Sequence, residues 1–277
     1  MTRVIVLGSR GMLGHMVFRF LSGKDLDVMA LDERWNPRNH VQLSQKLARL
    51  KPDVCINAIG TRESDGRGSD ELFWTNGSLP GVISKALPSD CKFIHASSDA
   101  VFSSIARGCQ WNAPRHPDTE YGRSKHLGEL GMTRTHDWII RCSLIGPERT
   151  SPKSLLSWFL LQQKPVQGFT NQRWNGITTL EWSQLCLDII QGRTIGCEHI
   201  VQPGTLPPAS KYSLLKCSSR IFEHPVKVIP ACSDVPVRRS LIPNISCVSL
   251  EEQLTRLKAF IRVDRQGIKL PSRLKRD

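Results

Sequence analysis

A tyrosine and a lysine stand four positions apart in the segment Tyr121-Gly122-Arg123-Ser124-Lys125. Side chains at this spacing lie on one face of a helix. There the ammonium of Lys125 can stabilise a phenolate and lower the pKa of Tyr121, which is about 10 for a free phenol. The phenol could then exchange a proton with a substrate near neutral pH. The same pattern also occurs by chance on surface helices, so its meaning depends on the motifs that surround it.

A glycine turn near the start of the chain has the pattern of a dinucleotide-binding turn. Residues 3–7 are an apolar run typical of a strand, and a helical pattern follows the turn through Leu21. Gly8 permits the tight turn, Gly11 lets backbone approach a pyrophosphate, and Gly14 lets the helix pack closely on the sheet. The helix N-terminus then offers unpaired N–H groups to the phosphates.

The second expected strand, residues 27–31, is followed by Asp32. An acidic residue at about this distance binds the ribose hydroxyls of the adenosine. Asp32 favours NADH, because a carboxylate repels the 2′-phosphate of NADPH. Arg10 and Arg34 favour NADPH, because a guanidinium can pair with that phosphate. The sequence leaves the choice between the two cofactors open.

Later strands end in small or polar residues. A strand over residues 53–57 ends in Asn57-Ala58-Ile59, a strand over 92–96 leads into Ser98, and a strand over 138–142 leads into Ser143. Alternating strands and helices predict a parallel sheet with helices on both faces. Ligands bind at the carboxyl ends of such strands. The predicted cofactor-binding residues are Gly8, Arg10, Gly11, Met12, Leu13, Gly14, Asp32, Arg34, Asn57, Ala58, Ile59, Tyr121 and Lys125.

Four features in this order resemble the extended short-chain dehydrogenase/reductases: the glycine turn, Asn57-Ala58, Ser98, and Tyr121-x-x-x-Lys125. Within that group, residues 97–102 resemble the Ser-Thr-Asp-Tyr-Val-Phe segment of dTDP-4-dehydrorhamnose reductases. Residues 121–129 resemble the Tyr-Gly-x-(Thr/Ser)-Lys-x-x-Gly-Glu helix of those enzymes, and residues 175–180 resemble a segment that opens one of their late helices. The glycine turn is also similar to that of GDP-fucose synthases, which use NADPH.

The resemblance implies a Rossmann-type doubly wound parallel sheet, of the α/β class, with a smaller C-terminal substrate lobe. It implies NADPH or NADH as cofactor and the keto group of a nucleotide-linked deoxy-sugar as substrate, in cell-surface polysaccharide biosynthesis. The implied catalytic residues are Ser98, Tyr121 and Lys125. Tyr121 would protonate the carbonyl oxygen, Ser98 would hydrogen-bond the same oxygen, and Lys125 would bind the ribose and lower the pKa of the phenol.

Epimerases and 4,6-dehydratases on the same fold are the enzyme alternatives. Dehydratases often carry Asp-Glu after the serine or threonine, and epimerase/reductases carry a cysteine there, whereas this chain has Asp99 and Ala100. Reduction is therefore the simplest interpretation. The reductases usually have tyrosine at the position of Ala100, which implies an altered substrate pocket. A cofactor-binding subunit without catalysis is the remaining alternative.

The strict alternation of strands and helices ends after residue 147. Residues 155–161, 180–190, 211–219 and 250–261 have helical patterns, residues 199–201 read as a late strand, and residues 168–174 read as a loop. We expect a dinucleotide-binding domain of residues 1–147 plus about 176–203. Residues 148–175 and 204–277 would form the substrate lobe, which ends in a basic tail.

The residues expected to contact the substrate are Asp99, Arg173, Trp174 and Asn175. Tryptophan can stack on a base, and arginine can pair with a diphosphate. Asp99 could bind a sugar hydroxyl or cap its own loop. An ordinary loop position is an equal alternative for the other three residues.

The chain has 277 residues and a formal net charge of +13. This charge favours anionic partners, which a nucleotide cofactor and a nucleotide-linked substrate would satisfy, and no motif for nucleic-acid binding accompanies it. Nine cysteines without paired spacing suit a reducing cytoplasm, and neither they nor the histidines have metal-ligand spacing. No apolar stretch is long enough to span a membrane. A homodimer is the assembly we would test first.

Overall fold

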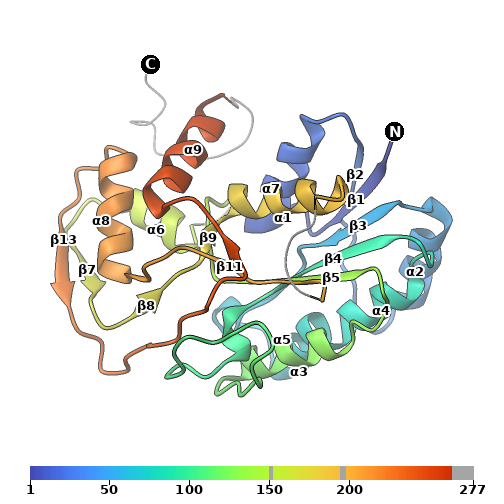
Figure 1. The fold of residues 1–277 in the computed structure, drawn as a ribbon, viewed down its shortest axis with the longest axis horizontal. Helices are drawn as coiled ribbons and strands as arrows, with labels where there is room; N and C mark the ends of the chain where they lie inside the picture. The colour runs from blue at the N-terminus through green and yellow to red at the C-terminus, as the bar shows by residue number, and fades with distance from the viewer. Residues whose placement is uncertain (150–151, 194–197, 264–277) are drawn as a thin grey trace.

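The computed structural model describes residues 1–149, 152–193 and 198–263. Its centre is a six-stranded parallel sheet in the order β10-β5-β4-β3-β1-β2 (Figure 1). The strands are β1 (Arg3–Leu7), β2 (Asp27–Leu31), β3 (Val54–Asn57), β4 (Lys92–Ser97), β5 (Asp137–Arg141) and β10 (Ile200–Val201). The strand order reverses between β1 and β3, so a crevice opens at their carboxyl ends. The predicted α/β class and parallel sheet are confirmed.

Helices cover both faces of the sheet. The helices α1 (Met12–Ser22) and α7 (Thr179–Ile190) lie on one face, and α2 (His40–Leu50), α4 (Leu79–Ala86) and α5 (Glu120–Leu130) lie on the other (Figure 1). Alternate residues of β1 contact the two helix layers, because successive side chains of a strand point to opposite faces of the sheet. Val4 and Val6 pack with α1 and α7, whereas Ile5 and Leu7 pack with α2 and α4.

The helix α2 was not predicted from the sequence. Only Leu43 and Leu47 of that helix are buried. Two apolar side chains one turn apart give a weak signal of helical periodicity.

The helix before β4 contains a π turn. The chain runs from α3 (Ser69–Phe73) through the π turn at Trp74–Ser78 directly into α4. Within the turn, the buried Asn76 accepts a hydrogen bond from the backbone N–H of Thr61 at 3.1 Å and donates to its carbonyl at 2.8 Å. Its amide also donates to Ser124 Oγ on α5 at 3.1 Å. The π turn therefore ties the loop after β3 to α5.

A smaller C-terminal core packs beside the sheet. Its elements are α6 (Leu155–Leu161), β7 (Val166–Phe169), α8 (Lys211–Ile221), β13 (Val228–Ala231) and α9 (Leu250–Val263). Buried Phe159, Leu214 and Leu257 belong to this core. The other short strands are β6 (Leu144–Ile145), β8 (Arg173–Trp174), β9 (Ile177–Thr178), β11 (Pro203–Gly204), β12 (Ala209–Ser210) and β14 (Ile245–Ser246). The exact division into two domains stays a prediction, and residues 264–277 of the basic tail lie outside the described residues.

The prediction of a loop over residues 168–174 was wrong. The first two of these residues end β7, which pairs in parallel with β13, and the last two form β8, which pairs antiparallel with β12. Each partner strand lies more than thirty residues further along the chain, so no local pattern marks these short pairings.

A buried ion pair fixes α5 to the sheet. Arg141 ends β5 and is fully buried, and its Nε and Nη2 donate to the two carboxylate oxygens of Glu129 at 2.8 and 2.7 Å. Ser97, at the end of β4, donates to the same carboxylate at 2.6 Å. Burial alone would raise the pKa of Glu129, but the hydrogen bonds and charge of Arg141 outweigh it and hold that pKa below its usual value. Arg141 also donates to the carbonyl of Trp111 at 2.9 Å, which ties down the loop before α5.

Replacing Arg141 with methionine would leave the Glu129 carboxylate buried without its main partner. We expect the free energy of unfolding, measured by urea denaturation, to fall by about 3–5 kcal/mol. The matched control is Arg256→Met, which breaks an i,i+4 pair with Glu252 whose side chains are 52% and 50% exposed. That control should change stability by less than about 1 kcal/mol. Equal losses in the two variants would contradict the anchoring role of the buried pair.

Candidate active site

The glycine turn closes as its spacing predicts. Gly8 has a φ of +78°, and a Cβ at Gly14 would lie 2.1 Å from the Gly8 carbonyl oxygen. At Gly11 a Cβ would meet only that oxygen, at 3.5 Å, so a side chain there would enter the cavity that Gly11 lines. α1 begins directly after Gly11, which supplies no side-chain cap. The first-turn N–H groups of α1 are therefore left for a ligand.

A cavity of about 430 Å³ joins this turn to the α5 residues. We call it the cofactor cavity. Its lining includes Gly11, Met12, Leu13, Ala58, Ile59, Ala96, Tyr121 and Lys125. The structure thus brings together most of the residues predicted to bind the cofactor. The sequence analysis did not assign Arg62 or Lys153, which also line the cavity.

Two predicted cofactor residues, Arg10 and Asp32, lie together where β2 ends and the glycine turn begins. Ser9 Oγ donates to Asp32 Oδ1 at 2.5 Å, and Arg10 Nε lies 3.5 Å from Asp32 Oδ2. Arg34 does not join them, because its Nη2 donates to Glu71 Oε1 at 2.6 Å. It lines a separate hollow beside Trp35 and Trp74. The carboxylate of Asp32 and the guanidinium of Arg10 therefore remain next to each other at the predicted adenosine end.

Asn57 is the last residue of β3, and its buried side chain supports the backbone that follows. It is fully buried; its Oδ1 accepts from the Ile59 N–H at 3.0 Å, and its Nδ2 lies 3.1 Å from His95 Nδ1. Burial, assisted by the charge of Lys125, holds the pKa of His95 well below its usual value, so the ring is neutral. Contact between Asn57 and the cofactor stays a prediction, and the bonds of its side chain show a supporting role. It holds Ala58 and Ile59 at the cavity wall.

The pair that α5 carries lies at the centre of the site. Thr119 caps the helix, since its hydroxyl accepts from the Gly122 N–H at 3.0 Å. Lys125 is buried, and its Nζ donates to the Ala96 carbonyl at 2.6 Å. Burial lowers the pKa of Lys125 from 10.5 to about 8, although nearby Glu129 raises it in part. The lysine remains an ammonium at neutral pH, next to the half-buried Tyr121.

Burial raises the pKa of Tyr121 above its ordinary value, and the charge of Asp99 raises it further. A hydrogen bond with the Ser98 side chain and the charges of Arg62 and Arg239 act in the opposite direction. The phenol is consequently protonated at neutral pH and is in the form that can donate a proton.

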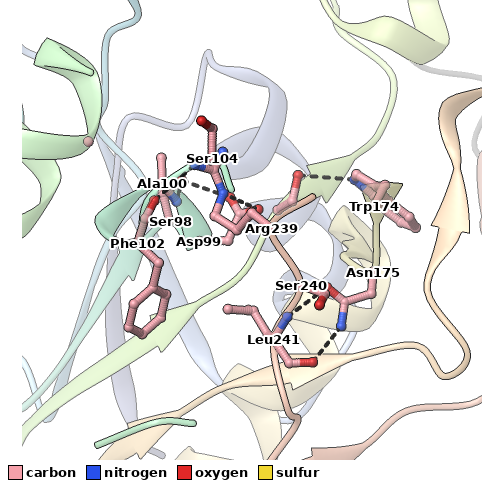
Figure 2. A network of polar contacts seen from close by, with 12 residues as sticks. Ser98, Asp99, Ala100, Phe102, Ser104, Trp174, Asn175, Arg239, Ser240 and Leu241 are labelled. Atoms are coloured by element: carbon pink, nitrogen blue, oxygen red, sulfur yellow. Dashed lines mark hydrogen bonds and ion pairs between the residues drawn. The ribbon is translucent and has the colours of Figure 1, made fainter. Parts of the chain in front are cut away.

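Tyr121 also lines a second cavity, of about 510 Å³. We call it the substrate cavity; its lining includes Ser98, Asp99, Ala100, Tyr121, Ser143 and Arg239. Ser98 Oγ accepts from the Ala100 N–H at 3.1 Å and lies 3.3 Å from Asp99 Oδ1. The serine hydroxyl thus has a fixed place at the start of the loop (Figure 2).

Arg239 is a residue of this cavity that the sequence analysis missed. Its Nε lies 3.2 Å from Asp99 Oδ2, and its Nη1 donates to the Phe102 carbonyl at 3.0 Å (Figure 2). The Asp99 carboxylate therefore binds the Arg239 guanidinium as well as the Ser98 hydroxyl of its own loop. The two residues are separated by 140 positions, so no local motif could have joined them.

The three residues predicted together at 173–175 have different surroundings. Asn175 is buried, and its side chain donates to the Leu241 carbonyl at 2.8 Å and accepts from the Leu241 N–H at 3.2 Å (Figure 2). Trp174 is also buried, and its Nε1 donates to Ser143 Oγ at 3.0 Å. The positions of these two side chains give no support to substrate contact and assign them to internal packing. Arg173 is exposed and lines a third cavity.

Over the described ranges 1–149, 152–193 and 198–263, no three His, Cys, Asp or Glu side chains are grouped so that they could hold a metal ion. No helix in the same ranges has both the length and the apolar character needed to cross a membrane.

Sequence comparison gives a family and two distant relatives. The family model described as "RmlD substrate binding domain" matches residues 1–172. The spore coat polysaccharide biosynthesis protein SpsK of Bacillus subtilis is 30% identical over 156 residues, which cover 52% of this chain and 54% of that protein. A dTDP-4-dehydrorhamnose reductase of Burkholderia thailandensis is 32% identical over 146 residues, which cover 50% of this chain and 48% of the relative. The chain thus spans about half the length of the relatives it matches.

Comparison with solved structures shows the same fold over nearly the whole chain. The dTDP-4-dehydrorhamnose reductase of Bacillus anthracis in complex with NADP has a TM-score of 0.82 at 18% identity, and covers 95% of this chain and 100% of its own. WbmH of Bordetella bronchiseptica in complex with NAD+ has a TM-score of 0.74 at 16% identity, with coverage of 97% and 100%. The UDP-glucose 4-epimerase of Thermotoga maritima reaches 0.72 at 17% identity, covering 95% and 99%. These likenesses concern the fold, which reductases and epimerases share.

The burial of Lys125 predicts a distinct dependence of stability on pH. Its pKa is about 8 in the folded protein and 10.5 ordinarily, so the unfolded chain binds more protons between these values. The lysine therefore destabilises the fold most below pH 8, and this penalty disappears as the pH rises toward 10.5. We expect the stability of Lys125→Met relative to the wild type to be greater at pH 7 than at pH 10 by roughly 2–3 kcal/mol.

The measurement is urea denaturation of both proteins at the two pH values. Lys216→Met, which removes an exposed lysine from α8, is the control and should show no such difference. A stability difference between Lys125→Met and wild type that is the same at both pH values would show that the lysine is not desolvated.

Proposed function

Because the chain belongs to the family described as "RmlD substrate binding domain", we propose that it is a reductase that uses NADPH or NADH to reduce the keto group of a nucleotide-linked deoxy-sugar. The observation that carries this proposal is the position of Tyr121. It lines both the cofactor cavity, with the glycine turn and Lys125, and the substrate cavity, with Ser98 and Asp99. A proton donor at this junction can serve a ketone that meets the cofactor there.

The residues of the cofactor cavity fit a dinucleotide. The N-terminus of α1 and the bare backbone at Gly11 suit a pyrophosphate. Ala58 and Ile59 offer a small apolar wall, and Lys125 has an ammonium at neutral pH to hold a ribose hydroxyl. When bound, the dinucleotide supplies a hydride to the carbonyl carbon.

The residues of the chain supply the proton and stabilise the charge that develops on the oxygen. Tyr121 holds its proton at neutral pH and donates it to the carbonyl oxygen. Ser98 offers a second hydroxyl to the same oxygen. The positive charge of Lys125 then favours the phenolate that Tyr121 becomes, so the resting pKa can be high while the proton still leaves.

The surroundings of Asp99 support reduction over elimination or epimerisation. Asp99 is paired with Arg239, and the next position is the buried methyl of Ala100, so neither offers a second acid–base group to the cavity. The names of the relatives point the same way, since they include a dTDP-4-dehydrorhamnose reductase and a probable dTDP-sugar 4-ketoreductase of Streptomyces antibioticus. A role in polysaccharide biosynthesis is part of the proposal, in line with the name of the Bacillus subtilis relative.

Replacing Tyr121 with phenylalanine removes the proposed proton donor and keeps the ring. With a 4-keto nucleotide sugar, we expect the rate of NADPH or NADH oxidation to fall by about 10²–10⁴-fold, while cofactor affinity stays within a factor of about three. Tyr212→Phe, at the only other tyrosine of the chain, is the control and should keep full activity. Turnover of the sugar without net consumption of cofactor would instead identify an epimerase or dehydratase. If Tyr121→Phe changed no measured property of the protein, a cofactor-binding subunit without catalysis would be favoured.

The contact between Asp32 and Arg10 predicts how cofactor preference can be shifted. The carboxylate opposes a 2′-phosphate, and the guanidinium favours it. We expect Asp32→Ala to raise the ratio of NADPH affinity to NADH affinity by about tenfold, and Arg10→Ala to lower it by a similar factor. Fluorescence titration of both cofactors measures the ratio. Arg34→Ala is the control, because Arg34 is paired with Glu71, and should leave the ratio unchanged. If the ratio changed in the same direction in Asp32→Ala and Arg10→Ala, neither residue would lie at the adenosine site.

A further inference from the structure

Three arginines surround a third cavity, of about 330 Å³, which the proposed reaction does not use. Arg107, Arg173 and Arg238 line it together with Pro207, Pro208 and Ser240. We call this cavity the arginine pocket. All three arginines are exposed, and they come from three separate parts of the chain. The volume lies at the lower end of the range for small-molecule sites.

Backbone pairings bring these three parts together. The segment that carries Arg238 pairs with the residue before β8, through the bridge between Gln172 and Val237. It also pairs with the loop of Arg107, through the bridge between Cys109 and Leu241. The Arg173 N–H donates to the Val237 carbonyl at 2.7 Å. The arginines therefore stand on connected backbone and are held near one another before any ligand binds.

The charge of the arginine pocket is not balanced by the protein. Within the described part of the chain, Arg107, Arg173 and Arg238 form no ion pair, and no carboxylate lines the pocket. Several other exposed arginines are paired, as Arg220 is with Glu251 at 2.6 Å. Like charges gathered at one cavity repel, and an anion removes that repulsion.

The arginine pocket is next to the substrate cavity. Arg238, Arg239 and Ser240 are consecutive, and the middle residue lines the substrate cavity while its two neighbours line the arginine pocket. Figure 2 shows Arg239 directed toward Asp99, with Ser240 and Leu241 leading away toward Asn175. Residues 238–240 therefore contribute to both the substrate cavity and the arginine pocket, where a negatively charged group could bind.

We propose that the arginine pocket binds a diphosphate group. Guanidinium groups pair with phosphate oxygens through two parallel N–H bonds, and three of them can neutralise both phosphates of a diphosphate. One source is the substrate itself, whose sugar would lie on the Arg239 side; this reading rests on the proposed function. The other source is a free nucleoside diphosphate that binds without reacting.

The test is calorimetric titration of the full chain with inorganic pyrophosphate and with thymidine diphosphate. Excess NADPH is present, so that the glycine turn does not compete. We expect Arg107→Ala and Arg238→Ala each to raise the Kd by at least about tenfold. Arg256→Ala removes the same charge from α9 and should leave the Kd unchanged. Equal Kd values in all variants, or an equal rise in all three, would overturn the proposal. Since the arginines are exposed, unchanged melting curves are expected and verify folding.

Kinetics then separates the two sources. A KM for the nucleotide sugar that rises about tenfold in Arg238→Ala at constant kcat, with competitive inhibition by thymidine diphosphate, identifies the diphosphate of the substrate. An unchanged KM, with noncompetitive inhibition that Arg238→Ala relieves, identifies a separate nucleotide. The titration needs no turnover, so an inactive protein that still binds pyrophosphate through these arginines would refute the reductase and retain the diphosphate site.

Discussion

The buried pair of Glu129 and Arg141 is the interaction on which the site depends. Glu129 follows Lys125 by four residues and Tyr121 by eight, so all three lie along one stripe of α5. Its carboxylate is held by Arg141 at the end of β5 and by Ser97 at the end of β4. Neither charge can leave the other without a large desolvation penalty. The helix therefore has one available register against the sheet, and in that register Tyr121 lines both cavities.

Much of the fold was predictable because its signals are local. The buried strand β1 reads as a short apolar run, and the glycine turn after it reads from its spacing. Both β1 and the partly exposed edge strand β2 were predicted at their observed bounds. The short strands β7 and β8 carry no such run and exist because distant partners pair with them. α2 was missed because it buries few residues. Local pattern thus determines the sheet, whereas the smaller lobe depends on pairings of long sequence separation.

The same distinction applies to the candidate site. Residues that contribute through their place in a motif, such as Gly11, Tyr121 and Lys125, come together at the cofactor cavity. The amides of Asn57 and Asn175 bond to backbone groups inside the protein, and the sequence could not show this because an amide looks alike whether it faces a ligand or satisfies buried backbone. Arg239 could not be found at all, since only the folded chain brings it to Asp99. Polar residues that hold the scaffold and polar residues that bind ligands differ only in their partners.

The π turn between α3 and α4 restricts how this protein can vary. A helix advances about 100° per residue, so the extra residue of a π turn rotates everything before it relative to everything after it. The turn lets α4 pack its apolar side on the sheet while Asn76 still reaches Thr61 and Ser124. Loss of a single residue from Trp74–Ser78 would restore ordinary helix and turn one half of this surface away from its partners. Insertions and deletions are therefore poorly tolerated in this helix, even though none of its side chains takes part in the chemistry.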